Sequence, residues 1–168
     1  MSAAAAAGYV FGRELRACHI DMDLAPVVDV NTNPANRVIG DRSYGEDPAR
    51  VAAMGAAFIR SIQEQGVAAC AKHWPGHGDT TEDSHEELPT LTHDMARLRS
   101  TEMRPFAAAL DAGVASVLVA HLLVPAMEPP GCEPVPGSCS GAVVGYLRRE
   151  MGYDGLVMVG ESQLNDGD

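Results

Sequence analysis

The sequence predicts an α/β fold, because helical segments alternate with short apolar runs and because polar side chains gather where these runs end. Strand character is found in four apolar runs, at residues 20–30, 66–73, 113–121 and 155–159. Each run follows a segment with helical spacing, and runs that are apolar almost throughout are typical of parallel strands covered on both faces. The 168 residues suit one ordinary domain or a part of a larger one.

The expected helices begin and end at recognisable residues. They cover residues 6–18, 47–65, 93–112 and 140–151. Asp47 and Pro48 form an N-cap followed by a first-turn proline. Pro105 predicts a kink in the third helix, or its division into two, because proline removes a backbone donor and crowds the preceding turn. Gly152 favours the end of the fourth helix.

The charge and hydrophobicity of the sequence limit which classes of binding partner the protein is expected to have. The net charge of −11 argues against nucleic acid or an anionic membrane, since both attract Lys and Arg. No apolar run approaches the ~20 residues that cross a bilayer, and the N-terminus lacks the charged region of a signal peptide. We therefore expect a cytoplasmic protein without a nucleic-acid or membrane partner, and its protein partners stay open.

The four cysteines form no CxxC pair. Cys70 lies in an apolar run and is interpreted as a buried thiol. Cys132 and Cys139 flank a loop rich in Pro and Gly, and a disulfide between them stays a less favoured alternative because nothing else indicates an oxidising compartment.

Polar side chains follow the predicted strands. Asp29, Asn31 and Asn33 follow the first strand, residues 72–85 the second, and His121 the third. Ligands bind at the carboxyl ends of strands in doubly wound sheets and in (β/α)8 barrels. The sequence therefore predicts a ligand site at this end of the sheet.

The stretch after the second strand carries groups suited to acid–base chemistry. A carboxylate beside an imidazole favours its protonated form, so Asp83 and His85 make a candidate general acid and base; the alternative is a chance D-x-H in a surface loop. Lys72 and His73 stand where the strand ends and can donate hydrogen bonds to sugar hydroxyl groups. The alternative for the lysine is an internal ion pair.

Two further interpretations concern an arginine and a metal. Arg42 offers a planar fork of donors for bidentate recognition, or else forms a salt bridge with Asp41 or Asp47. A third hypothesis is that the histidines bind the metal of a metal-dependent hydrolase, but they form no HExxH motif or compact ligand set. The candidate metal ligands are His73, His77, His85 and His93. We expect neither a metal nor another cofactor.

The stretch "KHWPGHGDTTEDSHEELP" matches the pattern K-H-[FWI]-P-G-H-G-x-x-x-x-D-S-H-x-x-x-P at every defined position. This pattern, together with "DMDLAPVVDV" and "NPANRVIGDRSYGEDP" upstream, resembles the β-N-acetylglucosaminidase branch of the family-three glycoside hydrolases. The resemblance runs from about Gly12 to Met158. The D-x-H loop distinguishes this branch from the β-glucosidases, which take their acid/base carboxylate from elsewhere.

The resemblance implies a (β/α)8 barrel and a retaining reaction at β-linked N-acetylglucosamine. His85 would protonate the leaving oxygen and later activate water, with Asp83 orienting it, while Arg42, Lys72 and His73 would hold the sugar. A neutral base repels anions less than a carboxylate does, so phosphate could compete with water as the acceptor.

Two departures from the family pattern bear on activity. A complete barrel needs roughly twice this length, so we expect only about the third to the seventh strand. The family nucleophile is an aspartate after the seventh strand, and Gly160 occupies its position, with Glu161 one residue out of register. We therefore divide the chain into a partial barrel domain, 1–159, and an aberrant tail, 160–168, for which read-through of a retained intron is one hypothesis.

Without a nucleophile we expect the chain to be inactive as a glycosidase. The alternative from another class is a non-catalytic sugar-binding module or a degenerate remnant that keeps the donors of Arg42, Lys72 and His73.

Overall fold

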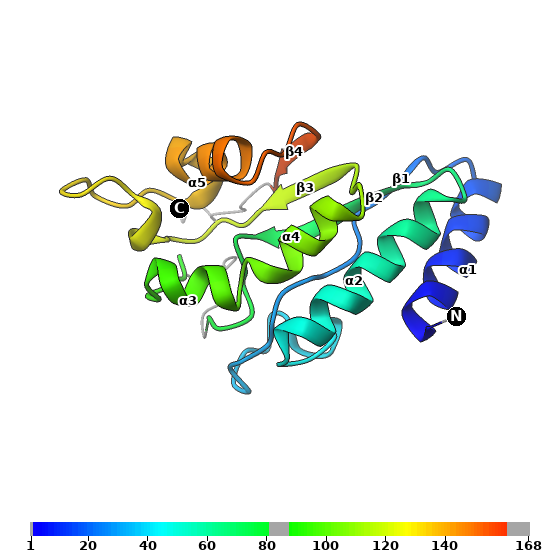
Figure 1. Ribbon diagram of the computed structural model, residues 1–168, viewed down its shortest axis with the longest axis horizontal. Coiled ribbons are helices and arrows are strands. Elements are labelled where there is room, and N and C mark those ends of the chain that lie inside the picture. The colour runs from blue at the N-terminus through cyan, green and yellow to red at the C-terminus, as the bar shows by residue number, and fades with distance from the viewer. Residues whose placement is uncertain (1, 81–87, 161–168) are drawn as a thin grey trace, which may run out of the picture.

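A computed structural model describes residues 2–80 and 88–160 of the chain. Its sheet has four parallel strands in the order β1-β2-β3-β4, with helices between them (Figure 1). The strands are β1 (Met22–Asp23), β2 (Ala68–Trp74), β3 (Ser116–Val119) and β4 (Leu156–Val159). The helices are α1 (Ala3–Ala17), α2 (Pro48–Gln63), α3 (Met95–Ser100), α4 (Arg104–Asp111) and α5 (Gly141–Gly145), with the 3-10 helices η1 (Gly40–Arg42), η2 (Pro125–Met127) and η3 (Gly137–Cys139) and the π-helix η4 (Tyr146–Glu150). The predicted α/β alternation with parallel strands is confirmed.

The first strand is shorter than the predicted run 20–30. Regular pairing is confined to Met22 and Asp23, which oppose Ala68 and Ala69 of β2. The chain beyond still follows β2, since Val28 N donates to Lys72 O at 2.8 Å. Pro26 has no N–H to give to a ladder, so the regular strand does not continue through it. The prediction of a long first strand is therefore wrong in its extent.

The predicted helix boundaries depend on local capping chemistry. Asp47 accepts a hydrogen bond from Ala49 N at 3.0 Å, and Pro48 stands in the first turn of α2. The third predicted helix is divided into α3 and α4, with Pro105 in the first turn of α4. The division confirms one of the two outcomes expected for that proline.

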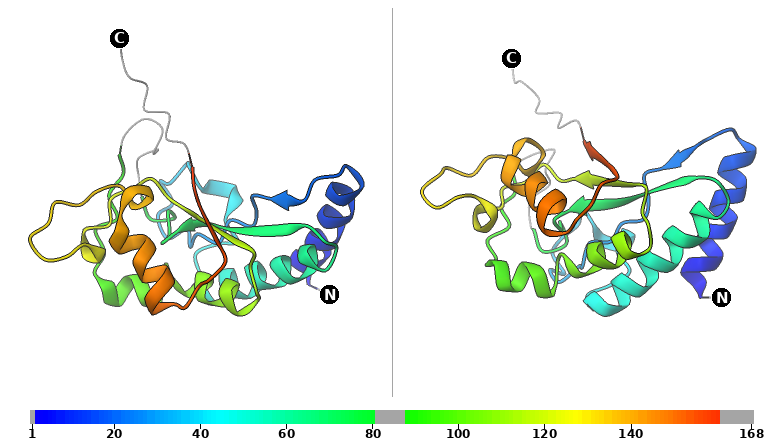
Figure 2. Two further views of the ribbon diagram at one scale, coloured as in Figure 1. Left: turned by 90° about the horizontal axis from the view of Figure 1, so that it is seen from above. Right: turned by 45° about the horizontal axis from the view of Figure 1, so that its top comes forward.

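Helices α2 and α4 lie together on one side of the sheet, and α1 packs on α2 (Figures 1 and 2). Small residues bring these layers close. A Cβ on Gly8 would lie 2.7 Å from Phe58 O, and one on Gly55 would lie 2.7 Å from Val28 Cγ1. The core between the layers includes Phe58, Ile59, Ile62, Val67, Trp74, Leu98, Phe106 and Val117.

The outer edges of β1 and β4 have no neighbouring strand among the described residues. Leu156 and Val159 of β4 are about half exposed, at 51% and 55%. An edge strand with exposed apolar side chains is normally covered by another element. The described sheet is therefore an open array of parallel strands and not a closed barrel.

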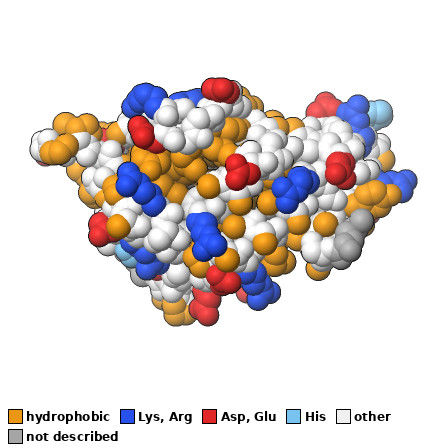
Figure 3. Space-filling model, in the orientation of Figure 1, with side chains coloured by type: hydrophobic (Ala, Val, Ile, Leu, Met, Phe, Trp, Pro, Cys, Tyr) orange, Lys and Arg blue, Asp and Glu red, His pale blue; other side chains and the backbone are white. Residues whose placement is uncertain are grey.

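Charged side chains are spread over the surface on the face shown in Figure 3, where basic and acidic groups are scattered and neither sign gathers. A shallow hollow of about 210 Å³ lies between α4 and η4, lined in part by Met103, Tyr146 and Met151. No helix within 2–80 and 88–160 has both the length and the apolar composition for crossing a bilayer.

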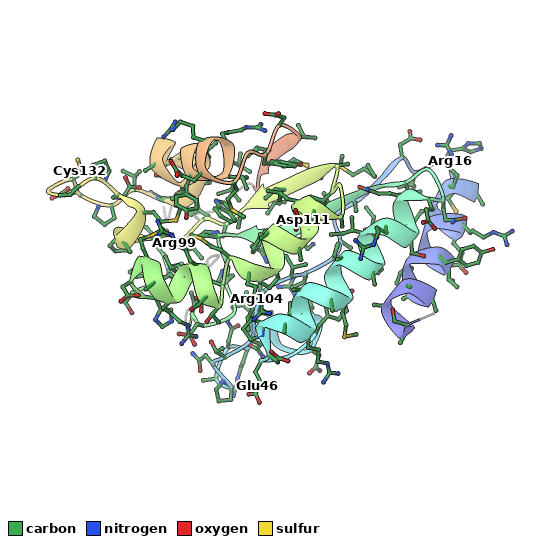
Figure 4. All side chains as sticks on the ribbon, viewed as in Figure 1. Arg16, Glu46, Arg99, Arg104, Asp111 and Cys132 are labelled. Carbon is green, nitrogen blue, oxygen red and sulfur yellow. The ribbon has the colours of Figure 1, made fainter. Side chains whose placement is uncertain are left out.

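The loop between β3 and α5 projects from the body of the molecule, with Cys132 near its tip (Figure 4). Cys132 and Cys139 are both exposed free thiols, so the alternative of a disulfide between them is not observed. Cys70 is buried in β2, as predicted. Burial raises the pKa of its thiol, which makes it a structural residue and not a reactive one.

Candidate sugar-binding site

Lys72 and His73 stand at an irregularity near the carboxyl end of β2. Lys72 is paired with Leu118 and Trp74 with Val119, so His73 is an extra residue in the strand. Such a bulge re-aims side chains that would otherwise alternate between the two faces. The peptide bond between Lys72 and His73 is cis.

Trp74 fixes this end of β2 in the core. Its side chain is fully buried, and its ring lies edge-on to that of Phe106, with centroids 5.3 Å apart. Its Nε1–H donates to Val143 O of α5 at 3.1 Å. A buried indole with a satisfied N–H holds its place firmly, so the backbone of the two residues before it is held as well.

Asp29, in the chain after β1, is a fully buried carboxylate that receives hydrogen bonds from this turn. The Nδ1 atom of His73 lies 2.7 Å from Asp29 Oδ2, and the backbone N–H groups of His73 and His77 donate to Oδ1 at 3.1 and 2.8 Å. Burial by itself would raise the pKa of Asp29, but the charge and hydrogen bond of His73 and the N–H of His77 hold it below its usual value. Asp29 is thus an ionised acceptor inside the protein.

The residues after Asp29 hold the turn that follows Trp74. Asn36 Nδ2 donates to His77 O at 2.7 Å, and Asn33 Nδ2 donates to Thr80 O at 3.3 Å. The backbone of Gly78 lies directly on that of Val30, because a Cβ on this glycine would stand 2.0 Å from Val30 O. The P-G-H-G turn is therefore held against residues 30–36, a segment distant from it in the sequence.

Arg42 and Lys72 line the same pocket, of about 700 Å³, beside the edge of β1. The pocket is also lined by Phe11, Leu15, Asp23, Leu24, Ala25, Pro26, Val27, Asp41, Tyr44 and Phe58. Arg42 ends η1, and its Nη2 donates to Val38 O at 2.6 Å. Burial, and secondly the nearby charge of Arg42, lower the pKa of Lys72. Burial also raises the pKa of Tyr44 to about 12.

The internal ion pairs considered for these two cations are not observed within the described part of the chain. Neither Arg42 nor Lys72 has a carboxylate within salt-bridge distance there. Asp23 and Asp41 line the same pocket, so carboxylates lie near the two cations without pairing with them directly. This arrangement favours binding of a ligand that is rich in acceptor oxygens.

A second Asp–His pair is formed by one residue before and one residue after residues 81–87 in the sequence, Asp79 and His93. His93 Nε2 lies 2.5 Å from Asp79 Oδ2, and Thr32 Oγ1 donates to the other carboxylate oxygen. Arg97 donates to Thr32 at 3.3 Å and pairs with the buried Glu102 at 3.1 Å. Thr32 therefore links the loop after β1 both to Asp79 and to Arg97 of α3.

The other predicted site residues are placed as follows. Asp83 and His85 lie outside the described residues. His121 lies at the end of β3, with Nδ1 2.7 Å from Ser138 Oγ. Gly160 follows β4 directly and is exposed. Within 2–80 and 88–160 no three side chains of His, Cys, Asp or Glu gather as metal ligands do.

Sequence reasoning missed the part that Asp29 plays, although it placed this residue at the end of the first strand. The signal was an acid within an apolar run, "PVVDV", which needs donors if it is buried. Asn36, Thr80 and the pairing of Asp79 with His93 carried no local signal, because their partners are distant in the sequence.

Comparison with known proteins gives the family. The glycosyl hydrolase family 3 N-terminal domain matches residues 1–166. The chain belongs to this family. It is 37% identical over 157 residues to a β-hexosaminidase of Bordetella avium strain 197N, covering 94% of this chain and 43% of that protein. It thus spans less than half the length of the curated relatives it matches.

Solved structures support the same assignment. A family 3 β-N-acetylglucosaminidase from Paenibacillus sp. FPU-7 superposes with a TM-score of 0.89 at 48% identity, covering 94% of this chain and 30% of that one. A β-glucoside phosphorylase, BglX, superposes with a TM-score of 0.91 at 28% identity, covering 95% of this chain and 30% of that one. The partial α/β barrel expected from the family resemblance is confirmed as the fold. The boundary at Val159 stays a prediction.

Proposed function

We propose that the chain is the sugar-binding portion of a family 3 glycoside hydrolase barrel that acts on β-linked N-acetylglucosamine. The observation that carries the proposal is the position of Arg42 and Lys72 on one pocket beside the edge of β1, with neither side chain in a salt bridge within the described residues. Both side chains are donors, and a sugar offers ring and hydroxyl oxygens as acceptors. His73, the next residue after Lys72 in the sequence, is the third sugar-binding residue of the proposal.

In the complete reaction, His85 acts as the general acid and base and Asp83 orients its imidazole. His85 gives a proton to the leaving oxygen, then takes one from the water that releases the sugar. The β-hexosaminidase and β-N-acetylglucosaminidase names of the relatives support this assignment. A carboxylate nucleophile is needed for the covalent step, and Gly160 has no side chain to supply it. The chain as it stands binds the sugar without turning it over.

An aryl N-acetylglucosaminide assay, run beside a direct measurement of N-acetylglucosamine binding, tests the proposal. We expect binding and no turnover. Arg42→Gln and Lys72→Met should each weaken binding about tenfold or more, since each removes a charged donor. Arg50→Gln, which changes an exposed arginine of α2, is the matched control and should bind like the parent.

The outcomes separate the alternatives. Turnover by the unaltered chain would contradict the missing nucleophile. No binding of any sugar would leave a remnant that keeps the fold alone. Turnover by the unaltered chain that a chelator abolishes would instead indicate the metal-dependent hydrolase.

The acceptor of the complete enzyme is a separate choice between water and phosphate. The name of the β-glucoside phosphorylase among the structural relatives favours testing phosphate. In a chain extended to the length of its relatives, with an aspartate after Val159, added phosphate should divert product to the sugar phosphate if phosphorolysis competes. Product analysis with and without phosphate decides between the two.

A further inference from the structure

We propose that Asp29 is a positioning residue that keeps the proton of the neutral His73 ring on Nδ1 and leaves Nε2 as a hydrogen-bond acceptor for a sugar hydroxyl. The proposal rests on the proposed function, because it assigns the chemical part of one sugar-binding residue.

The assignment of the proton follows from the partner of Nδ1. Asp29 Oδ2 lies 2.7 Å from His73 Nδ1, and an ionised carboxylate accepts hydrogen bonds without donating any. The hydrogen between the two atoms therefore belongs to the ring. In a neutral imidazole a proton on Nδ1 leaves a lone pair on Nε2.

The other surroundings of the His73 ring agree with the proposed acceptor role of Nε2. Within the described residues, Nδ1 makes the only hydrogen bond of the His73 ring, and the ring of His77 lies edge-on to it with centroids 5.9 Å apart. The His73 side chain is 17% exposed, whereas Asp29 is fully buried. The ring therefore has its bound edge inside the protein.

The two oxygens of Asp29 have separate tasks. Oδ1 accepts from the backbone N–H groups of His77 and His73, at 2.8 and 3.1 Å. Oδ2 lies nearest the ring, and its contact with His73 N is longer, at 3.3 Å. The backbone donors thus fix which oxygen remains for the imidazole.

An acceptor on His73 changes which ligand groups the proposed sugar-binding residues can recognise. Lysine and arginine side chains are donors only, so they bind an ether oxygen and a hydroxyl oxygen alike. When the His73 ring is neutral, its Nε2, which has no hydrogen-bond partner among the described residues, requires a hydrogen on the ligand. We therefore expect the site to prefer a sugar hydroxyl over the corresponding methyl ether at the position that meets His73.

The variant Asp29→Asn tests the proposal because it should invert the ring. The Asn oxygen must stay with the two backbone N–H groups, which places the amide NH₂ where Oδ2 stood. That NH₂ donates to Nδ1 and moves the ring proton to Nε2, as happens in the triad of a serine protease when its aspartate becomes asparagine. The backbone donors keep their acceptor, so the fold should be retained.

The tautomer is measured on ¹⁵N-histidine-labelled protein from two-bond ¹H–¹⁵N correlations, at alkaline pH once the ring shifts stop changing. We expect the pattern of an Nδ1 proton for His73 in the parent and that of an Nε2 proton in Asp29→Asn. Asp79→Asn is the matched control, since Asp79 binds a different histidine, and it should leave His73 unchanged. An Nε2 proton in the parent, or the same shift in the control variant, would overturn the proposal.

Titration with N-acetylglucosamine on the same samples tests the acceptor role. Asp29→Asn should bind about tenfold more weakly than Asp79→Asn, because a donor then faces the sugar where an acceptor stood. Equal affinities with an inverted ring would refute that role. If the parent shows the Nδ1 proton but binds no sugar, the proposed function fails while the positioning by Asp29 stands. If Asp29→Asn does not fold, the parent tautomer decides the positioning alone.

Discussion

Two Asp–His pairs lie near the P-G-H-G turn: an inner pair, Asp29–His73, and an outer pair, Asp79–His93. They differ in how deeply their side chains are buried. In the inner pair, Asp29 is fully buried and His73 is 17% exposed. In the outer pair, Asp79 and His93 are 25% and 26% exposed. The contact distances are similar, at 2.7 and 2.5 Å. The contact distance therefore does not show which pair contributes more to stability. A buried donor left without an acceptor costs far more than a donor that water can reach.

Replacing the two aspartates by alanine should separate the pairs most strongly. Asp29→Ala leaves two backbone N–H groups and a ring N–H without an acceptor in the core, so we expect a loss of about 3–5 kcal/mol in the free energy of unfolding. Asp79→Ala breaks a partly exposed pair and should cost about 1 kcal/mol. Urea unfolding of both variants measures the difference. Equal losses would contradict the role given to burial.

The close contact of Gly78 with Val30 sharpens the comparison, because it holds the turn onto the segment that carries Asp29. In Gly78→Ala the new Cβ would meet Val30 O at 2.0 Å, and backbone atoms cannot turn away as a side chain can. We expect a loss of about 3 kcal/mol, at the upper end for overpacking.

Gly141→Ala is the control for that substitution. It adds the same methyl group at the first residue of α5, where nothing lies within 4 Å. Thermal unfolding should show little change or a small gain, since alanine favours helix. A similar melting temperature for the two variants would mean that the turn is not held as described.

The sequence predicted correctly the features that depend on neighbouring residues, and it failed for features that depend on residues distant in the sequence. Helix boundaries at Pro48 and Pro105 were predictable, because capping and the missing N–H act within one turn. The short extent of β1 was not, since it depends on how the chain around Pro26 meets β2. The position of the site, at the strand ends, was predictable from the sequence. The contacts that hold its residues in place were predicted only in part.

The reason for that incompleteness is visible in the residues themselves. Lys72 and His73 are adjacent in the sequence, yet Lys72 lines the pocket with Arg42 while His73 is held by Asp29, 44 residues earlier. Alternation along a strand cannot predict a bulge, and the bulge decides where each side chain points. The predicted roles of Asp83 and His85 remain predictions.

Acid should affect the inner pair in a defined direction. The pKa of Asp29 is lowered in the folded chain, so between that pKa and the unfolded value of 3.8 the unfolded state binds more protons. The stabilisation from Asp29 is therefore complete above this window and is lost as the pH falls through it. Asp29→Asn should show a shallower loss of stability below pH 3.8 than Asp79→Asn does. Matching acid profiles for the two variants would show that Asp29 is not the more strongly coupled acid.

The smallest expected effect concerns Lys72, which is the only lysine of the chain and can be followed without ambiguity. Burial, then the charge of Arg42, lowers its pKa. Between that pKa and 10.5 the unfolded state binds more protons, so the charged side chain costs stability at neutral pH and the cost fades as the pH rises. Lys72→Met should therefore raise the free energy of unfolding by about 0.5 kcal/mol at neutral pH, a gain that shrinks in alkali. NMR of ¹⁵N-lysine-labelled protein should show a higher pKa for Lys72 in Arg42→Gln, still below 10.5 because burial persists. If Lys72 titrates at 10.5 in the parent, the two cations do not share the pocket, and the donors proposed to hold the sugar do not act together.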